Sequence, residues 1–408
     1  MKDSGIEWIG EIPESWDTVK FKYLHNGLNT GEAIDKEHWT SDENDTVFYT
    51  AGLKPIRTSY TGFPDWKYTK ENDLLLARNG TPYVYFPVAN ACYTDHIIRA
   101  GMVENANRRF IQYGLQQSIN SIVVDSVSIA TWSASLWNEQ TIPYPSDEEQ
   151  QKISTHLDRQ CAHIDNIIEK TKASIEEYKK LRQAVVTQAV TKGVRGDRPM
   201  KDTGFDWLLQ IPDDWTMERG KNLFFETNNR SDSGEEELLT VSQYTGVTPR
   251  SQKNVNMFEA ETLEGYKICE IGDVAANTMW LWAGAIGVSE YYGVISPSYN
   301  IYRQKKDAYN SKYLDYLLRI PPIVQLFASL STGIRASRLR LYPEQFLNIY
   351  YPLPPLDEQA EIVAYLQEEI VEVDNLITKK EQFLTELESY KKSMIYEYVT
   401  GKKEVPQA

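Results

Sequence analysis

Several polar side chains that suit contacts with nucleic-acid bases follow apolar, strand-like runs of the sequence. Arg78, Asn79 and Thr81 come directly after the run DLLLA, and a second run, STGIRASRLRL, carries three arginines. Arginine can donate two hydrogen bonds to O6 and N7 of guanine, and asparagine suits adenine. The candidate DNA-reading residues, which include positional counterparts from the second half of the chain, are Arg78, Asn79, Thr81, Asn277, Trp280, Thr332, Arg335, Arg338 and Arg340. The alternative is that these turns only end a strand, with their side chains in water.

The sequence lacks the motifs that catalysis on DNA needs. It has no glycine-rich cofactor loop, no Asn or Asp followed by Pro-Pro-Tyr or Pro-Pro-Phe, and no GxxxxGK[ST] phosphate loop. The nuclease-like triplet EYK at 177–179 lies within a predicted helix, where a solvated helix face explains it better. His156, Cys161 and His163 do not have the i, i+4 spacing of a helical metal site. We therefore expect no catalytic centre, no metal site and no cofactor in this chain.

Composition and charge narrow the class of protein. The 408 residues predict two or three domains, and 41% hydrophobic residues are enough for packed cores. No apolar run approaches a membrane span and the start MKDSGIEW does not resemble a signal peptide, so we expect a soluble, cytoplasmic protein. The three cysteines form no CxxC motif, which excludes a disulfide framework. A net charge of −15 argues against unaided, nonspecific binding of nucleic acid, but residues 17–146 and 216–352 carry only −3 and −1, so arginines can cluster there.

The sequence repeats itself, and this repeat defines its organisation. Residues 2–16, KDSGIEWIGEIPESW, return at 201–215 as KDTGFDWLLQIPDDW, with seven of fifteen positions identical. PYPSDEEQQKISTHLD, from residue 143, returns from residue 352 as PLPPLDEQAEIVAYLQ. The chain is therefore two tandem halves, each with a short lead segment, a middle and a terminal segment. We interpret the repeated tryptophans of the lead segments as packing anchors; they are Trp8, Trp16, Trp207 and Trp215.

The terminal segments, 147–192 and 353–402, predict long helices. Their apolar residues recur at alternating steps of three and four over more than four heptads. Ser146 with Glu149 can form a capping box, and Gly193 and Gly401 are natural stops. Two seams of equal length favour pairing of the helices in an antiparallel coiled coil. The predicted seam residues are Leu157, Ile164, Ile168, Ile175, Leu366, Val373, Ile377 and Leu384. The alternative is that each helix lies on its own domain.

The middles predict β-rich α/β domains. Short β-branched or aromatic runs at 73–79, 121–132, 237–244 and 293–303 predict strands, and 311–329 predicts a helix. The fold class expected is α+β, with two such domains in tandem pseudo-twofold repeat, separated by an antiparallel coiled coil of two long helices. The predicted parts are a lead segment (1–16), the first middle (17–146), the first helix (147–192), a linker with the repeated lead segment (193–215), the second middle (216–352) and the second helix (353–402).

These features resemble the specificity subunit of type I restriction-modification systems. The resemblance rests on GIEWIGEIPESW, PLPPLDEQAEIVAYL, WAGAIGVSEYYGVISPSYNIY and STGIRASRLRL, and it covers essentially the whole chain. It implies that the middles are target-recognition domains, each reading half of a split double-stranded DNA site, and that the helices bind two modification (methyltransferase) subunits. It also implies S-adenosylmethionine in those partners, and ATP with Mg²⁺ where restriction (translocase and nuclease) subunits join.

The difference between the middles predicts an asymmetric site, because unlike readers select unlike half-sites. Two other classes of function stay open. A coiled-coil scaffold that binds only proteins would explain the acidic charge and the heptads equally well. A stand-alone DNA-modifying enzyme is the other, and the missing cofactor loops argue against it.

Overall fold

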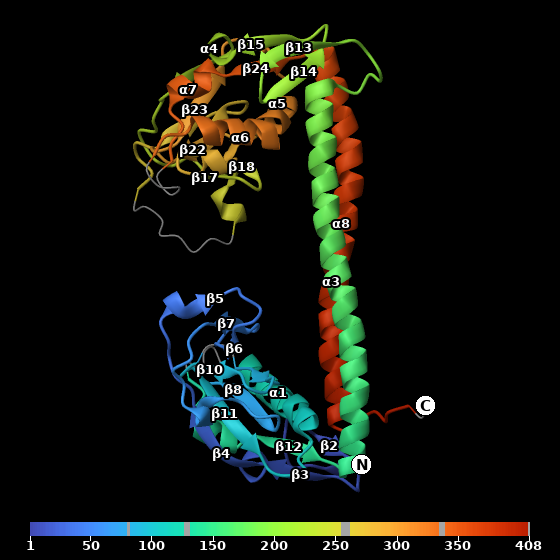
Figure 1. Ribbon diagram of the computed structural model, residues 1–408. Helices are drawn as coiled ribbons and strands as arrows, with labels where there is room; N and C mark the ends of the chain where they lie inside the picture. The colour runs from blue at the N-terminus through green and yellow to red at the C-terminus, as the bar shows by residue number, and fades with distance from the viewer. Residues whose placement is uncertain (80–81, 126–130, 254–261, 334–338, 407–408) are drawn as a thin grey trace. The chain divides into compact units, whose positions relative to one another are not determined.

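The computed structural model describes residues 1–79, 82–125, 131–253, 262–333 and 339–406. The chain divides into two compact units (Figure 1). Unit 1 comprises Met1–Lys172 and Gln382–Ala408, and unit 2 comprises Ala173–Glu381. The two long helices, α3 (Asp147–Lys192) and α8 (Leu356–Val399), each contribute one stretch to both units. Both units contain helices and sheets, so the structure is of mixed helix and sheet.

Unit 1 is built on a four-stranded antiparallel sheet in the order β4-β11-β8-β9. A second sheet has the order β10-β6-β7-β5, and the pairs β1-β2 and β3-β12 lie outside both. The elements before α3 are β1 (Lys2–Asp3), β2 (Glu11–Ile12), β3 (Asp17–Lys20), η1 (Phe21–Tyr23), β4 (His25–Thr30), η2 (Lys36–His38), β5 (Trp39–Thr40), β6 (Thr46–Tyr49), β7 (Ile56–Thr58), η3 (Asp65–Lys67), β8 (Asp73–Ala77), β9 (Val84–Tyr85), β10 (Cys92–Tyr93), β11 (Ile97–Met102), α1 (Arg108–Asp125), α2 (Ala134–Asn138) and β12 (Thr141–Tyr144).

Unit 2 contains a sheet of the same kind, in the order β16-β23-β20-β21. The hairpin β17-β18 and the pair β19-β22 lie beside it, while β13-β14 and β15-β24 correspond to β1-β2 and β3-β12. Its elements between α3 and α8 are β13 (Met200–Phe205), β14 (Leu208–Pro212), β15 (Thr216–Arg219), α4 (Gly220–Leu223), β16 (Phe224–Thr227), β17 (Leu239–Ser242), β18 (Gly246–Pro249), η4 (Arg250–Gln252), β19 (Lys267–Cys269), β20 (Val274–Ala276), η5 (Leu281–Ala283), β21 (Ile286–Val288), β22 (Gly293–Ile295), β23 (Asn300–Gln304), α5 (Ser311–Leu318), α6 (Pro321–Leu330), α7 (Pro343–Asn348) and β24 (Tyr350–Leu353).

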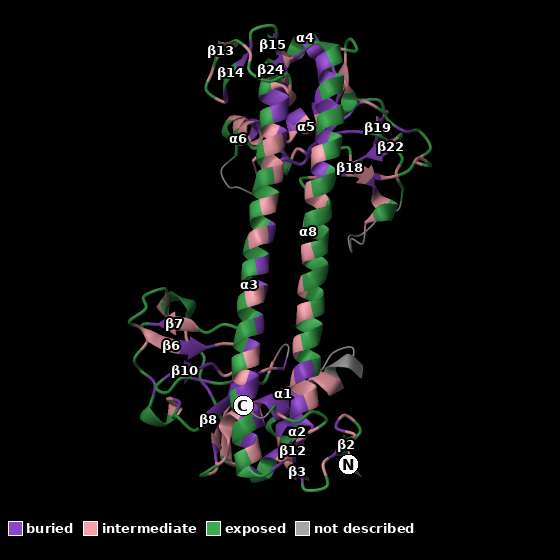
Figure 2. Cartoon of the chain, turned by 90° about the vertical axis from the view of Figure 1, so that its right-hand side faces the viewer, coloured by how far each residue is buried: buried purple, intermediate pink, exposed green. Residues whose placement is uncertain are grey.

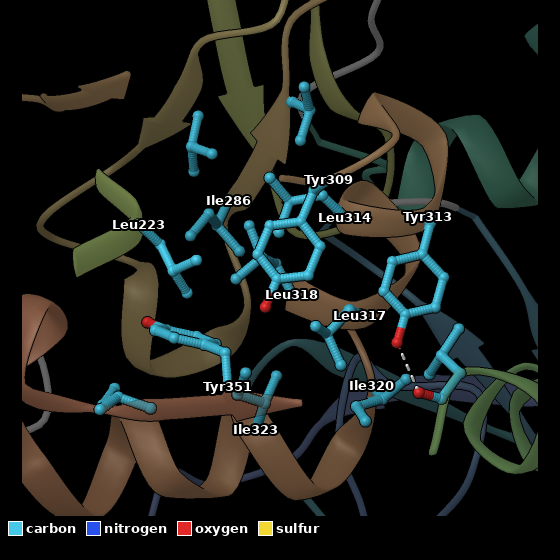
Figure 3. Close-up of a cluster of buried hydrophobic side chains, with 14 of the residues drawn as sticks. Leu223, Ile286, Tyr309, Tyr313, Leu314, Leu317, Leu318, Ile320, Ile323 and Tyr351 are labelled. Carbon is cyan, nitrogen blue, oxygen red and sulfur yellow. Dashed lines mark hydrogen bonds between the residues drawn. The ribbon is translucent and has the colours of Figure 1, made fainter. Parts of the chain in front are cut away.

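Strand β8 shows why an uninterrupted apolar run forms a strand here. All five of its residues are buried. Leu74 and Leu76 share a cluster with residues of α1, while Leu75 and Ala77 pack with residues of β6 and β10. The strand is therefore covered on both faces, so both of its alternating sets of side chains are apolar apart from Asp73 at its start. In unit 2, Val274 and Ala276 of β20 likewise share a cluster with residues of α5 and α6, and Ala275 packs with strand residues of the second layer. Figure 3 shows part of this cluster, including Leu314 and Leu317 of α5 and Ile323 of α6.

Three predictions from the sequence were wrong. The run 293–303, expected in a strand, forms two strands, β22 and β23, with the proline-containing segment 296–299 between them. Residues 121–125, expected in a strand, form the end of α1, because Ile111, Leu115 and Ile119 already place an apolar stripe of helical spacing against the sheet; residues 126–130 of that prediction lie outside the described residues. The expected helix 311–329 is two helices, α5 and α6. It breaks before Pro321 because proline disfavours the helical conformation in the residue before it, and Ile320 is extended, with φ −70° and ψ 147°.

Within each unit, α3 and α8 run antiparallel and share a hydrophobic cluster, and Figure 2 shows buried and exposed residues alternating along both helices. In unit 1, Asp165 of α3 accepts hydrogen bonds from Lys391 Nζ of α8 at 2.6 and 2.8 Å. In unit 2, Arg182 Nε of α3 donates to Asp374 of α8 at 2.8 Å. These two ion pairs are equivalent under the 209-residue offset, with the roles of the helices exchanged.

The ends of α3 agree with the prediction, whereas α8 spans Leu356–Val399 where a helix over 353–402 was expected. Gly193 and Gly401 follow α3 and α8 with φ of +75° and +70°, a left-handed conformation that glycine adopts without strain. The Ser146 and Glu149 side chains hydrogen-bond at 3.2 Å, and the Glu149 N–H donates to Ser146 Oγ at 3.4 Å. Helix α8 begins at Leu356, after Pro354 and Pro355.

Candidate nucleic-acid interface

In unit 1, a predicted reading segment directly follows β8. The Arg78 N–H donates to His96 O, and Arg78 O accepts from the Trp132 N–H at 2.6 Å, so the backbone is held on both sides. The Arg78 side chain is exposed, and it has no ion pair within the described part of the chain. Asn79 Nδ2 lies 2.7 Å from His96 Nδ1. The structure thus exposes the Arg78 guanidinium on a fixed backbone and pairs the half-buried Asn79 amide with His96, while Thr81 lies outside the described residues. Base contacts by these residues stay predictions.

In unit 2, the corresponding segment follows β20 but its first residue is turned inward. Asn277 is buried, and its Nδ2 donates to Tyr299 Oη at 2.9 Å and to Val241 O at 3.4 Å. Its Oδ1 accepts from the Met279 N–H at 3.2 Å. The Asn277 amide is therefore occupied by protein groups, and its position favours holding the loop over contacting a base. Trp280 is exposed and stacks on Trp282.

The arginine-rich run of unit 2 is described only at its two ends. Thr332 and Arg340 exchange backbone hydrogen bonds of 2.9 Å in both directions. Arg340 Nη1 donates to Leu339 O at 2.8 Å. Arg335 and Arg338 lie outside the described residues, so their roles stay predictions.

Two buried aspartates brace the sheets that carry these segments. Asp73 lies 3.6 Å from Arg99 Nε in unit 1, and Asp273 accepts two hydrogen bonds of 2.8 Å from Arg303 in unit 2. Each aspartate also accepts a backbone N–H three residues earlier, from Lys70 or Glu270. Burial raises the pKa of Asp73 above its ordinary value, against the opposing effect of Arg99. In the sequence, an Asp directly before an apolar run in each half, Asp73 before Leu74 and Asp273 before Val274, could have identified this pair.

The tryptophans of the lead segments are confirmed as packing anchors. Trp16 and Trp215 are buried, and their indoles donate to equivalent glutamates at the starts of the long helices. Trp16 Nε1 lies 3.3 Å from Glu149 Oε1, and Trp215 Nε1 lies 2.9 Å from Glu358 Oε2. The partly buried Trp8 and Trp207 pack against the same cores.

Sequence reasoning did not identify His96, Met279 and Trp282, which lie in or beside the two reading segments. His96 faces Asn79 across the sheet, and no motif marks it. Met279 and Trp282 belong to an apolar run that reads equally well as core. Among the described residues, no cluster of three or more His, Cys, Asp or Glu side chains could hold a metal ion. Within the described ranges, no helix is long and apolar enough to cross a membrane.

Comparisons with known proteins give one consistent family. Residues 13–177 match the family model of the type I restriction modification DNA specificity domain. A chain of Methanocaldococcus jannaschii assigned as the MjaX type I restriction enzyme specificity subunit is 23% identical, over 97% of this chain and 95% of its own length. The MjaVIII type I restriction enzyme specificity subunit of the same organism is 24% identical, over 64% of this chain and 61% of its own length.

A solved structure shows that the fold is shared. A chain from a study of complex assembly and conformational transition in the type I restriction-modification system superposes with a TM-score of 0.67 and 16% identity. The alignment covers 96% of this chain and 100% of that chain. The family model, the relatives and the shared fold agree, and the chain is similar over nearly its whole length to the specificity subunits of type I restriction-modification systems.

Proposed function

We propose that this chain selects the DNA sequence on which a type I restriction-modification complex acts. It is a non-catalytic DNA-recognition subunit, and it reads an asymmetric bipartite site with one unit on each half. One observation carries this proposal: the two units have sheets of the same strand order, yet the loops at the equivalent strand ends differ. Unit 1 displays Arg78 and Asn79 there, whereas unit 2 displays Met279 and Trp280.

The division of labour follows the sequence repeat. Residues 17–146 and 216–352 are the two target-recognition domains, and the lead segments at 1–16 and 193–215 anchor each to a helix. The helices 147–192 and 353–402 are the spacer, an antiparallel coiled coil about a pseudo-twofold axis. The equivalent ion pairs Asp165–Lys391 and Arg182–Asp374 support this arrangement, because a twofold relation exchanges the helices in this way.

The partners supply what this chain lacks. Affinity for DNA depends on neutralising phosphates, and a net charge of −15 supplies this poorly. Two modification subunits bound along the helices would add the positive surface, the S-adenosylmethionine and the pocket for the flipped adenine. Restriction subunits would add ATP- and Mg²⁺-dependent translocation and cleavage. The complex would work in the cytoplasm, where the DNA is.

Duplex binding across a salt series, with and without the modification subunit, tests the proposal. We expect sequence-specific binding and methylation by the complex, and neither methylation nor cleavage by this chain alone. Methylation mapping would give two unlike half-sites with an unread spacer. A complex without preference for any duplex would favour a protein-binding scaffold, and turnover by this chain alone with S-adenosylmethionine would favour a stand-alone enzyme.

A further inference from the structure

Trp280 is a large apolar side chain that unit 2 leaves in solvent at the end of its central sheet. It lies in the loop between β20 and β21, with 51% of its surface exposed, beside Met279, which is 38% exposed. The next residue, Leu281, is completely buried in the core of the unit. The chain therefore enters the core at Leu281, one residue after Trp280, and the Trp280 indole stays outside the core.

The loop that carries Trp280 is fixed by hydrogen bonds. Asn277 bonds to three protein groups, and Thr278 Oγ1 donates to Ser298 O at 2.7 Å. The Trp280 N–H donates to Asn277 O at 3.0 Å, and Gly284 closes the turn with a φ of +88°. Little backbone freedom remains to be lost when the loop meets a partner.

The indole itself is also held in place. It stacks on Trp282 with ring centroids 5.7 Å apart and an interplanar angle of 28°. Trp282 Nε1 in turn donates to Met279 O at 3.0 Å. One face of Trp280 is thus supported by a second indole, and an exposed, preorganised aromatic face suits stacking on a nucleobase.

The electrostatic surroundings suit DNA. Residues 274–289, which contain the loop, carry no charged side chain in a chain of net charge −15. Helix η5 of this loop packs on α6, which leads to the arginine-containing segment that ends at Arg340. Leu281 and Leu341, the neighbours of Trp280 and Arg340 in the sequence, belong to the same hydrophobic cluster. Arg340 has no acidic partner among the described residues.

We propose that Trp280 is a wedge that inserts into the DNA at one base step of the half-site read by unit 2. This inference rests on the proposed function. Apolar side chains that enter a duplex partly unstack a step, and the cost depends on which bases form it. Trp280 thereby favours flexible pyrimidine–purine steps without hydrogen-bonding to a base. Unit 1 places Arg78 and Asn79 at the equivalent strand end, so it reads its half-site by hydrogen bonds.

The test uses the complex of the full chain with its modification subunit on the methylation-mapped site. The variants are Trp280→Ala, Trp280→Phe and the matched control Tyr292→Ala. Tyr292 is 54% exposed, but it lies in the loop at the opposite end of β21. Single 2-aminopurine substitutions across the half-site report unstacking at each step, and titration gives Kd.

Wild type should enhance 2-aminopurine fluorescence at one step in addition to the flipped adenine. Trp280→Ala should lose that signal, keep the signal of the flipped adenine, and bind roughly 10-fold more weakly. Trp280→Phe should retain most of both properties, and Tyr292→Ala should match wild type. A mismatch at the step should tighten binding by wild type but not by Trp280→Ala, because the mismatch removes an unstacking cost that only the wedge incurs.

Either of two results would overturn the wedge. One is wild-type affinity and site choice in Trp280→Ala. The other is an equal loss of affinity on all duplexes with the step signal unchanged, which would place the indole outside the base stack. A wild-type complex that shows no sequence preference would instead overturn the proposed function, so the two failures are distinguishable.

Discussion

Units 1 and 2 share a framework but differ in what it carries. Both have a central antiparallel sheet with the same order of strands, a buried aspartate at the start of its central strand, and a tryptophan hydrogen-bonded to the start of a long helix. They differ in the second layer, which is a four-stranded sheet in unit 1 and two separate strand pairs in unit 2. The short repeated motifs and a central strand covered on both faces therefore determine the shared framework. The loops that this framework carries differ between the two units.

The largest expected effect tests whether the contacts between α3 and α8 contribute equally to stability in unit 1 and in unit 2. Ile168 is buried against residues of α8 in unit 1, whereas its counterpart Ile377 is half-buried in unit 2. Ile168→Asp should lower the free energy of unfolding by roughly 3 kcal/mol or more, because it places a charge in an apolar seam. Ile377→Asp should cost less, since its carboxylate stays partly hydrated. Denaturant unfolding and assembly with the modification subunit measure both, and unchanged values for Ile168→Asp would refute the seam.

The second prediction concerns the equivalent glutamates at the helix starts. Glu358 is completely buried and pairs with Arg198 as well as Trp215, whereas Glu149 bonds to Trp16 and Ser146 and is partly exposed. Glu358→Gln removes the shorter of the two ion pairs of the mostly buried Arg198 guanidinium, which also lies 3.6 Å from Asp214, and should destabilise unit 2 by about 2–4 kcal/mol. Glu149→Gln is the matched control and should cost under about 1 kcal/mol.

Hydrogen exchange can assign that loss to one unit. Glu358→Gln should speed exchange in unit 2 and leave unit 1 near wild type, because each unit has its own core. Equal losses of stability in Glu358→Gln and Glu149→Gln would show that the ion pair between Glu358 and Arg198 contributes nothing to stability.

The third prediction separates the two readers. Arg78→Ala should cost about 1–3 kcal/mol of DNA binding and relax the choice of base at one position of the unit 1 half-site. Arg335→Ala and Arg338→Ala should act in the same way on the unit 2 half-site. Methylation mapping by the complex measures these changes. If a variant weakens binding equally on all sequences, that arginine contacts phosphate or stabilises the domain.

The parts predictable from the sequence were those that local patterns determine. Helix α3 was predicted at its observed bounds, because heptad spacing, a capping serine and a terminal glycine all mark it. The run at 121–125 was mistaken for a strand because β-branched residues suit a strand and a buried helix equally. Asn277 was taken for an exposed reader because a strand end in the sequence does not reveal which way its side chain turns. The pairing of Asn79 with His96 depends on strand register, which no local pattern encodes.

The smallest expected effect concerns pH and one position at which the halves differ. His156 of unit 1 is buried against Tyr398, and its counterpart under the 209-residue offset is Tyr365. Desolvation, together with the charges of Arg159 and Lys403, holds the pKa of His156 below its ordinary value. The neutral imidazole is therefore favoured in the folded state. The associated stability is present above the unfolded pKa, about 6.5, and is lost as pH falls through the lower folded value.

His156→Gln should remove this component, so acidification from pH 7.5 to 5 should lower the Tm of wild type more than that of the variant. The exposed His163 on the same helix provides the control, His163→Gln, which should follow wild type. Parallel pH profiles for wild type and His156→Gln would show that the buried imidazole accepts its proton without cost to the fold.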